Sequence, residues 1–240
     1  MTFTIGVDVG GTKVLGGVVD ELGQVHKTAR RDTPKEGGAA LTAAIAEVAN
    51  ELKAQFPVES VGVSAAGWVS SDRKTMLATP NISGWNGVNL DYEFTQLIGL
   101  PVVIENDANS AAWGEARFGA AKGKQHVLLL TIGTGLGGGI VIDGKLHRGA
   151  FGIAAEVGHM RVVPDGLLCG CGAKGCFEQY GSGSALMRHT REAIEANPDI
   201  AEKLLARGDG TFSGLTGTMI MEAARAGDVI AIEDFRTTGK

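Results

Sequence analysis

Apolar residues near the start of the chain alternate with polar ones, or cluster in short runs that glycines separate, as β-strands do. Three strands are predicted over residues 3–9, 13–19 and 23–30, joined by Gly-rich turns. Residues 39–54 instead carry apolar side chains at helical spacing, and Pro57 follows the segment. Strands followed by a covering helix indicate an α/β domain.

The same alternation of strand and helix continues further along the chain. Residues 58–67 and 100–106 predict buried strands, and the second leads into a predicted helix over residues 107–118. The other expected elements are a buried strand at 125–133, strands at 136–144 and 145–149, and helical stretches at 184–206 and 216–226.

A shift of 123 residues superposes two parts of this pattern. The matched pairs are Val9 with Ile132, Gly10 with Gly133, Gly16 with Gly139, Val18 with Val141, and Asp20 with Asp143. Both copies have the order strand, Gly turn, strand, Gly/Asp turn, strand, which predicts a duplicated α/β fold with domains 1–118 and 119–240. The alternative is a chance match between two Gly-rich hairpins. No second pair of buried strands is predicted after the second copy, so we expect that domain to be incomplete at its C-terminus.

Composition and charge narrow the class of protein. The chain has 240 residues, is 44% hydrophobic and carries a net charge of −5 without a basic tail. This argues against nucleic acid or an acidic membrane surface as the main partner. We find neither a leader with a basic and then an apolar part nor an apolar run long enough for a membrane span. We therefore expect a cytoplasmic protein whose thiols stay reduced.

All three cysteines fall in one short segment, HMRVVPDGLLCGCGAKGC. Three thiols cannot all pair as disulfides, and a bridge between any two here closes a very short loop. One imidazole and three thiolates are instead the ligand count of a closed, structural zinc site. The sequence predicts such a site from His159, Cys169, Cys171 and Cys176; a histidine near unrelated buried thiols is the alternative.

Two glycine-rich turns are candidates for phosphate binding. The motif GTGLGG at residues 133–138 has the dinucleotide-binding spacing, but a strand follows it where that motif requires a helix. It remains a turn whose amides and hydroxyls suit phosphate oxygens. Its counterpart DVGGTK adds Asp8, placed to hold Mg²⁺ through water, and Lys13, placed to face phosphate charge. The alternative is a pair of ordinary tight hairpins.

Three carboxylates are candidates for chemistry on a substrate. Asp107 follows a predicted buried strand, where open α/β sheets place their sites, and is either a general base or the cap of the following helix. Glu156 and Glu178 flank the predicted zinc loop. If zinc fixes that loop, both are held rigidly and can accept hydrogen bonds from a polyol. The alternative is that they are solvated surface groups.

Several blocks together resemble the ROK family of bacterial sugar kinases and sugar-responsive repressors. They are DVGGTK, VSAAGWV, ATPNISGW, PVVIENDANSAAWGE, TIGTGLGGGIV and EVGHMRVVPDGLLCGCGAKGCFEQYGSGSAL. The blocks occur in the family's order over nearly the whole chain, and the glucose-phosphorylating kinases of actinobacteria are the most similar members. The resemblance implies a duplicated actin-like (ribonuclease H-like) ATPase fold, with two domains flanking a cleft.

The resemblance also implies roles for individual residues. Asp107 is expected to take the proton from the sugar 6-hydroxyl as it attacks the γ-phosphate of ATP. The expected sugar ligands are Gly67, Asn81, Asn106, Asp107, Glu156, His159 and Glu178. The expected nucleotide ligands are Asp8, Gly10, Gly11, Thr12, Lys13, Thr131, Gly133, Thr134 and Gly135. ATP, Mg²⁺ and structural Zn²⁺ are the implied cofactors, and a homodimer or homotetramer is the implied assembly.

Alternatives remain within and beyond this interpretation. Another hexose, such as N-acetylmannosamine or fructose, is the second candidate substrate, and polyphosphate is a second candidate donor. A repressor of the family would carry a DNA-binding segment before DVGGTK, but here that block begins at residue 8. Family members continue beyond the residue that matches Lys240, through a Gly-rich segment that helps to bind adenosine. We therefore expect a truncated chain with a weakened nucleotide site, and a sugar-binding protein without activity is the third candidate.

Overall fold

The computed structural model describes residues 2–79 and 82–239, which form two compact units. Unit 1 comprises Met1–Leu129 and Gly138–Ala155, and unit 2 comprises Leu130–Gly137 and Glu156–Lys240. The chain therefore passes between the units three times, twice within one hairpin. The domain boundary predicted between residues 118 and 119 stays a prediction.

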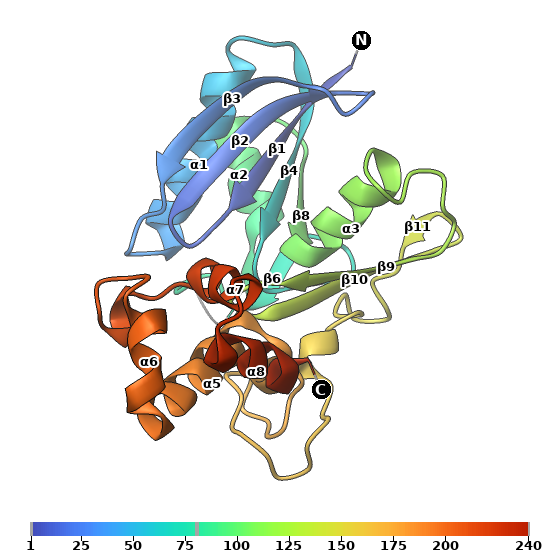
Figure 1. Ribbon diagram of the computed structural model, residues 1–240. Helices are drawn as coiled ribbons and strands as arrows, with labels where there is room; N and C mark the ends of the chain where they lie inside the picture. Colours follow the sequence, from blue (N-terminus) through green and yellow to red (C-terminus); the bar gives the residue numbers. More distant parts are fainter. Residues whose placement is uncertain (1, 80–81, 240) are drawn as a thin grey trace. The chain divides into compact units, whose positions relative to one another are not determined.

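A five-stranded mixed sheet forms the centre of unit 1, in the order β3-β2-β1-β4-β8 (Figure 1). Its strands are β1 (Phe3–Val9), β2 (Lys13–Asp20), β3 (Val25–Asp32), β4 (Val58–Ala65) and β8 (Val102–Asn106). β1, β4 and β8 run parallel, whereas β2 and β3 pair antiparallel. All five strands that the apolar pattern predicts for this region are thus confirmed.

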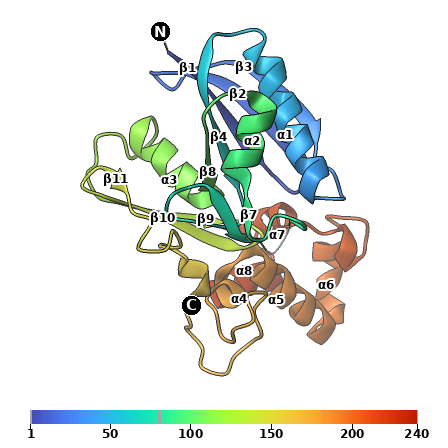
Figure 2. The same ribbon diagram turned by 180° about the vertical axis from the view of Figure 1, so that it is seen from behind.

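Two helices cover one face of this sheet, α1 (Gly38–Lys53) and α2 (Leu90–Ile98), as Figures 1 and 2 show from opposite sides. The apolar stripe of α1 packs on the sheet, and Val48 and Leu52 are fully buried there with Ile5. The sequence predicted α1. It did not reveal α2, which Asn89 caps by accepting a hydrogen bond from the Tyr92 amide.

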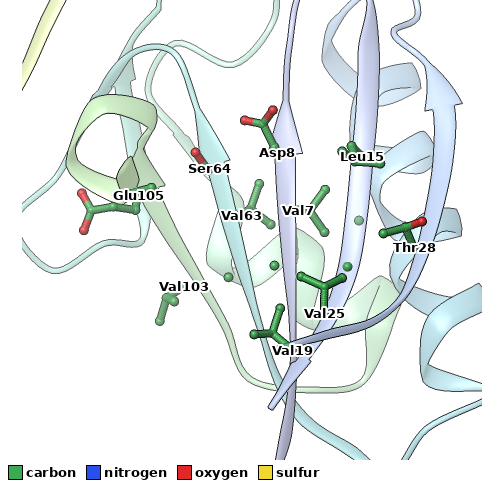
Figure 3. A pocket seen from close by; sticks show the side chains of 15 residues that line it. Val7, Asp8, Leu15, Val19, Val25, Thr28, Val63, Ser64, Val103 and Glu105 are labelled. Carbon is green, nitrogen blue, oxygen red and sulfur yellow. The ribbon is translucent and has the colours of Figure 1, made fainter. Parts of the chain in front are cut away.

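The opposite face of the sheet carries a groove of about 490 Å³, which Figure 3 shows from close by. Its floor is a row of three neighbouring glycines, because Gly6 pairs with Gly17 on one side and with Gly62 on the other. A methyl group added to Gly6 or Gly62 would meet no atom within 4 Å. The backbone of three central strands is therefore open on this face.

Two smaller sheets complete the strands. One contains β5 (Trp68–Val69), β6 (Thr75–Ala78) and β7 (Val88–Asn89); the other has the order β11-β10-β9, with β9 (Val127–Ile132), β10 (Leu136–Ile142) and β11 (Lys145–Leu146). The prediction that β9 is buried is wrong, since Leu128 is 60% and Ile132 68% exposed. β9 is an edge strand, whereas β10 packs against α3 (Asp107–Arg117) through Gly139 and Ala112.

Unit 2 is mainly helical after a long loop. Its elements are η1 (Val157–His159), α4 (Glu178–Gly181), α5 (Gly183–Ala196), α6 (Pro198–Leu205), η2 (Phe212–Gly214), α7 (Gly217–Arg225) and α8 (Val229–Thr238). Leu186, Leu204 and Ile220 are buried in its core. The predicted stretch 184–206 is two helices rather than one, because Pro198 cannot continue α5 and begins α6.

The helices were compared with the length and apolar character of membrane-spanning helices. Over residues 2–79 and 82–239, no helix combines the length and the apolar character that a membrane crossing requires.

Candidate functional site

In unit 1, the end of β8 brings two predicted sugar ligands together. Asn106 Oδ1 accepts a hydrogen bond from the Asn109 amide at 3.0 Å, which caps α3. Asn106 Nδ2 donates to the carbonyl oxygen of Gly67 at 3.1 Å. Gly67 has a φ of 153°, and a β-carbon there would lie 2.6 Å from Met76 Sδ. The predicted ligand Asn81 lies outside the described residues.

Asp107 is the first residue of α3 and is exposed. Its Oδ1 accepts a hydrogen bond from the Ala108 amide at 2.9 Å. The helix cap is Asn106, so capping does not account for the carboxylate of Asp107. The unpaired amides at a helix N-terminus favour a negative charge. The position therefore presents an oriented carboxylate to solvent, and its use as a general base stays a prediction.

Asp8 and Lys13 belong to the same electrostatic group as Asp107. Partial burial and the negative charge of Asp107 raise the pKa of Asp8, and Lys13 lowers it by less. Figure 3 shows the Asp8 side chain at the end of β1, beside Ser64 of β4. Two carboxylates that repel each other are a donor set that suits a hard cation with oxygen ligands, so the residues fit Mg²⁺.

The first glycine-rich turn, residues 10–13, is a tight connection between β1 and β2. The Gly10 amide donates to the carbonyl oxygen of Lys13 at 2.9 Å. Thr33, the residue after β3, fixes the turn with two hydrogen bonds. Its hydroxyl donates to the Gly10 carbonyl at 2.7 Å, and its amide donates to the Thr12 carbonyl. Gly11, Thr12 and Lys13 are exposed. The turn is thus held in shape while these three residues face solvent.

Glu105 and Arg148 are site residues that the sequence did not reveal. Glu105 Oε2 accepts a hydrogen bond from Arg148 Nε at 2.7 Å, and Arg148 Nη2 lies 2.7 Å from the same oxygen in an ion pair. Glu105 Oε1 accepts from Asn109 Nδ2 at 3.2 Å and from the Asn106 amide at 3.1 Å. The pair therefore braces the segment that carries Asn106 and Asp107. The two residues lie 43 positions apart, and no motif spacing connects them.

In unit 2, the predicted zinc ligands converge. His159 Nδ1 lies 3.6 Å from Cys169 Sγ, and Cys171 Sγ lies 3.7 Å from Cys176 Sγ. All four ligand atoms lie within 4.8 Å of one another, and the three cysteines are free thiols. Tetrahedral zinc with ordinary bond lengths implies ligand separations of about 3.5–3.8 Å. The donor set and its spacing fit zinc.

The backbone of the zinc loop is equally well defined. The Cys169 amide donates to the Ala173 carbonyl, and the Gly175 amide donates to the Leu167 carbonyl. Gly175 has a φ of 76°, and a β-carbon there would overlap the Val163 carbonyl. Burial raises the pKa of the Cys176 thiol, which disfavours a thiolate unless a dication stabilises it. A bound metal would therefore lock this loop.

Glu156, His159 and Glu178 all lie in unit 2, half-buried. His159 Nε2 lies 4.0 Å from Glu156 Oε2, so its two ring nitrogens face different groups. Glu178 Oε2 accepts a hydrogen bond from the Leu136 amide at 2.9 Å. This bond was not predicted from the sequence; it connects the segment that follows the zinc ligands with the residue after the second glycine-rich turn.

That second turn, Thr131–Gly135, is fastened to the start of α5. The Gly183 amide donates to the Gly133 carbonyl at 2.8 Å, and the Ser184 hydroxyl donates to the Thr134 carbonyl at 2.7 Å. A β-carbon on Gly183 would lie 2.6 Å from the Gly133 oxygen. The carbonyl oxygens of the turn are therefore satisfied by α5, and Thr131, Gly133 and Thr134 are exposed.

The sequence of this chain is similar to those of known proteins. The model of the ROK family matches residues 4–239. "Glucokinase" of Streptomyces coelicolor is 50% identical over 236 residues, which are 98% of this chain and 74% of that protein. "Glucokinase" of Thermotoga maritima is 37% identical over 229 residues, which are 95% of this chain and 71% of that protein.

A solved structure gives the same result for the fold. The crystal structure of a ROK family glucokinase from Streptomyces griseus, in complex with glucose and AMPPNP, is 51% identical with a TM-score of 0.85. The match covers 98% of this chain and 75% of that one. The predicted α/β fold of the sugar kinases is confirmed, and the chain belongs to the ROK family.

Proposed function

We propose that this chain is an ATP-dependent glucokinase, which phosphorylates glucose at the 6-hydroxyl to give glucose 6-phosphate. The observation that carries the proposal is the carboxylate of Asp107, exposed at the N-terminus of α3 and oriented by the Ala108 amide. The identity to glucokinases of Streptomyces, and the glucose and AMPPNP bound by one of them, support the sugar and the donor.

In the proposed reaction, Asp107 accepts the proton of the sugar 6-hydroxyl. The oxygen then forms a bond to the γ-phosphorus of ATP, and the bond from that phosphorus to the β,γ-bridging oxygen breaks, leaving ADP. Phosphoryl transfer requires mainly positioning and charge stabilisation from a protein. The ion pair of Glu105 with Arg148 would serve this positioning. Arg148 holds Oε2 of Glu105, while Oε1 accepts hydrogen bonds from the Asn106 amide and from Asn109 Nδ2, on either side of the base.

We propose seven residues as sugar ligands. Unit 1 supplies Gly67, Asn106 and Asp107, together with Asn81, which lies outside the described residues. Unit 2 supplies Glu156, His159 and Glu178. Carboxylates each accept more than one hydroxyl hydrogen, and the histidine presents one nitrogen to the thiols while the other faces Glu156.

The two glycine-rich turns are the proposed phosphate-binding segments. Lys13, with Gly10, Gly11 and Thr12, belongs to the first; Thr131, Gly133, Thr134 and Gly135 form the second. Mg²⁺ would be held through water by Asp8 and would neutralise charge on the transferred phosphoryl group. Zinc on His159, Cys169, Cys171 and Cys176 would be structural, since all four positions are taken by protein.

The setting of this activity is also a proposal. The free thiols of the zinc loop support a reducing compartment, the cytoplasm. We expect a homodimer or homotetramer that binds hexose and nucleotide and does not bind nucleic acid.

The direct test measures the formation of glucose 6-phosphate from MgATP and glucose. The product is detected in a coupled assay with glucose-6-phosphate dehydrogenase. Fructose and N-acetylmannosamine are assayed in parallel by ADP release. Turnover that prefers glucose supports the proposal. A preference for N-acetylmannosamine or fructose would reassign the substrate, and absence of turnover with all three sugars would contradict the proposed activity of this chain.

A further inference from the structure

A cavity of about 360 Å³ lies in unit 2, and none of the residues that line it is a proposed sugar, nucleotide or zinc ligand. It is formed by α5, α6 and α8, which contact one another and which Figure 1 shows together. Glu233 and Asp234 line the cavity from α8, Glu192 lines it from α5, and Ile200 lines it from α6. The proposed kinase reaction therefore leaves this cavity without a role.

Asp234 is a buried carboxylate that the fold does not satisfy. The residue is 4% exposed, and its Oδ2 has no hydrogen-bond partner among the residues that the structure describes. The hydroxyl of Thr190 lies beside it, but this hydroxyl donates its hydrogen to the Leu186 carbonyl at 2.9 Å. Burial raises the pKa of Asp234, and Thr190 lowers it by less. An unpaired buried carboxylate costs free energy, which a cation bound beside it would offset.

His189, the histidine of this cavity, is held as a neutral ring. Its Nε2 lies 3.1 Å from Arg188 Nη2, and Nε2 must accept this hydrogen bond because a guanidinium only donates. Nδ1 then carries the proton and donates to the Thr238 hydroxyl at 3.1 Å. A protonated His189 would lower the pKa of Asp234, but the neutral ring adds no positive charge to the cavity.

Two glutamates add negative charge at the rim of the cavity. The side chains of Glu192 and Glu233 are 64% and 59% exposed. Glu192 lies 3.7 Å from Arg188 Nε, and Glu233 lies 3.4 Å from Arg236 Nη1; such exposed ion pairs contribute little. None of the lining residues that the structure describes is a lysine or an arginine. The cavity therefore favours a positively charged ligand.

The acidic groups of the cavity are too widely spaced to share one metal ion. Within residues 2–79 and 82–239, only the zinc loop brings three or more ligand atoms of His, Cys, Asp or Glu within reach of a single ion. The walls of the cavity are partly apolar, since Ile200 is 51% and Val229 is 64% exposed there. Apolar walls between separated carboxylates suit an organic cation with a hydrocarbon chain.

We propose that this cavity binds a small aliphatic diamine, with one ammonium group beside Asp234 and the other at the rim near Glu192 and Glu233. The hydrocarbon chain lies against Ile200 and Val229. An ammonium group has three hydrogens to donate, so the inner one supplies the partner that Asp234 Oδ2 lacks. The inference does not depend on the proposed kinase function.

The test measures the binding of three compounds by calorimetry, at an ionic strength that screens non-specific attraction. 1,4-Diaminobutane carries an ammonium group at each end of its chain. Nα-acetyl-lysinamide carries a single ammonium group on a chain of the same length, and it represents the lysine side chain of another protein. 1,4-Butanediol has the same chain without charge.

Three variants are compared with the parent chain. Asp234→Asn removes the inner charge and keeps the shape of the side chain, whereas Glu192→Gln combined with Glu233→Gln removes both rim charges. Glu202→Gln is the matched control, because Glu202 is an exposed glutamate of α6 outside the residues that line the cavity. Circular dichroism shows whether each variant is folded.

We expect the parent to bind 1,4-diaminobutane, and Asp234→Asn to weaken this binding by about tenfold or more, since a hydrogen bond to a charged group is lost. The rim variant should weaken it by about fivefold, because exposed charges contribute less, and Glu202→Gln should match the parent. Nα-acetyl-lysinamide should bind more weakly than the diamine, and 1,4-butanediol should not bind.

Four results would overturn the inference. They are a parent chain that does not bind 1,4-diaminobutane, equal binding of 1,4-butanediol, unchanged diamine binding in a folded Asp234→Asn chain, and binding of Nα-acetyl-lysinamide as tight as that of the diamine. The last result would assign the cavity to a lysine side chain of a protein. If Asp234→Asn does not fold, the rim variant decides, and an affinity equal to that of the parent overturns the inference.

Discussion

Glu178 Oε2 accepts a hydrogen bond from the main-chain amide of Leu136 at 2.9 Å. The carboxylate follows the last zinc ligand by two residues, and the amide follows the second glycine-rich turn. A β-carbon on Gly135 would lie only 2.4 Å from the same oxygen, so the approach requires glycine. One side chain therefore connects the zinc loop with a turn that we assign to phosphate, in addition to its proposed contact with the sugar.

Two substitutions of Glu178 separate these roles. Glu178→Gln keeps an oxygen that accepts from the Leu136 amide, whereas Glu178→Ala removes it. We expect both to raise the KM for glucose, but only Glu178→Ala to raise the KM for ATP, by roughly tenfold, since a hydrogen bond to a charged group is lost. Steady-state kinetics with each substrate varied would check this. An equal KM for ATP in both variants would mean that the bond does not position the turn.

Asp107→Asn should reduce kcat by a factor of about 10²–10⁴ and leave the dissociation constant for glucose within a few-fold of the parent. The amide cannot accept the hydroxyl proton, although it retains the shape and an oxygen that the Ala108 amide can reach. Asp199→Asn, an exposed position in the first turn of α6, is the control. Steady-state kinetics measures kcat, and calorimetry measures the dissociation constant for glucose. A kcat of Asp107→Asn close to that of the parent would contradict the assignment of Asp107 as the base.

Cys171→Ser tests the zinc loop. Although Cys171 is exposed, its sulfur lies 3.7 Å from Cys176 Sγ within the ligand cluster. We expect the bound zinc to fall well below one per chain and the melting temperature to drop, since structural zinc contributes about 10 kcal/mol of binding free energy. Ala173→Ser changes an exposed residue of the same loop and should do neither. Metal analysis gives the zinc content of each variant, and thermal unfolding gives its melting temperature. A Cys171→Ser variant that lacks zinc but is stable and binds glucose would contradict a structural role of the metal.

Asp20, which is not among the proposed site residues, makes a pH-dependent contribution to the stability of the folded chain. Its side chain is 1% exposed and lies 2.8 Å from His26 Nε2, while its Oδ1 accepts from the Leu22 and Gln24 amides. The hydrogen bond from His26, followed by that from Gln24, lowers the pKa of Asp20 below its ordinary 3.8. A lowered pKa means that the folded chain binds this proton less readily than the unfolded one. The stabilisation is complete above 3.8 and is lost as the pH falls through the lower folded-state pKa.

Asp20→Asn should therefore lower the melting temperature at neutral pH, and the difference from the parent should shrink as the solution is acidified below this range. Thermal unfolding at a series of pH values measures this directly. Asp32→Asn, 92% exposed in β3, should change little at any pH. A difference for Asp20→Asn that does not depend on pH would assign its effect to packing.

How much of this could be predicted depended on how local each contact is. The strands of unit 1, α1 and α3 follow from apolar periodicity, and the zinc ligands follow from residue types within a single loop. The burial of β9 was misjudged, because its apolar run resembles a central strand and the sequence does not show which strand is at an edge. The Glu105–Arg148 ion pair and the His189–Thr238 hydrogen bond join distant residues, and no periodic pattern records such pairs.

The short sequence separation of the four predicted zinc ligands affects how fast their loop can form. Its four ligands lie within residues 159–176, so metal binding closes loops of at most 17 residues' separation. Contacts of such short range form quickly, and they do not wait for pairing between distant segments. The loop can therefore be completed during synthesis as soon as Cys176 has emerged, before α5 to α8 exist. A zinc ion bound at that stage would fix this loop before the helices that follow it in unit 2 are made.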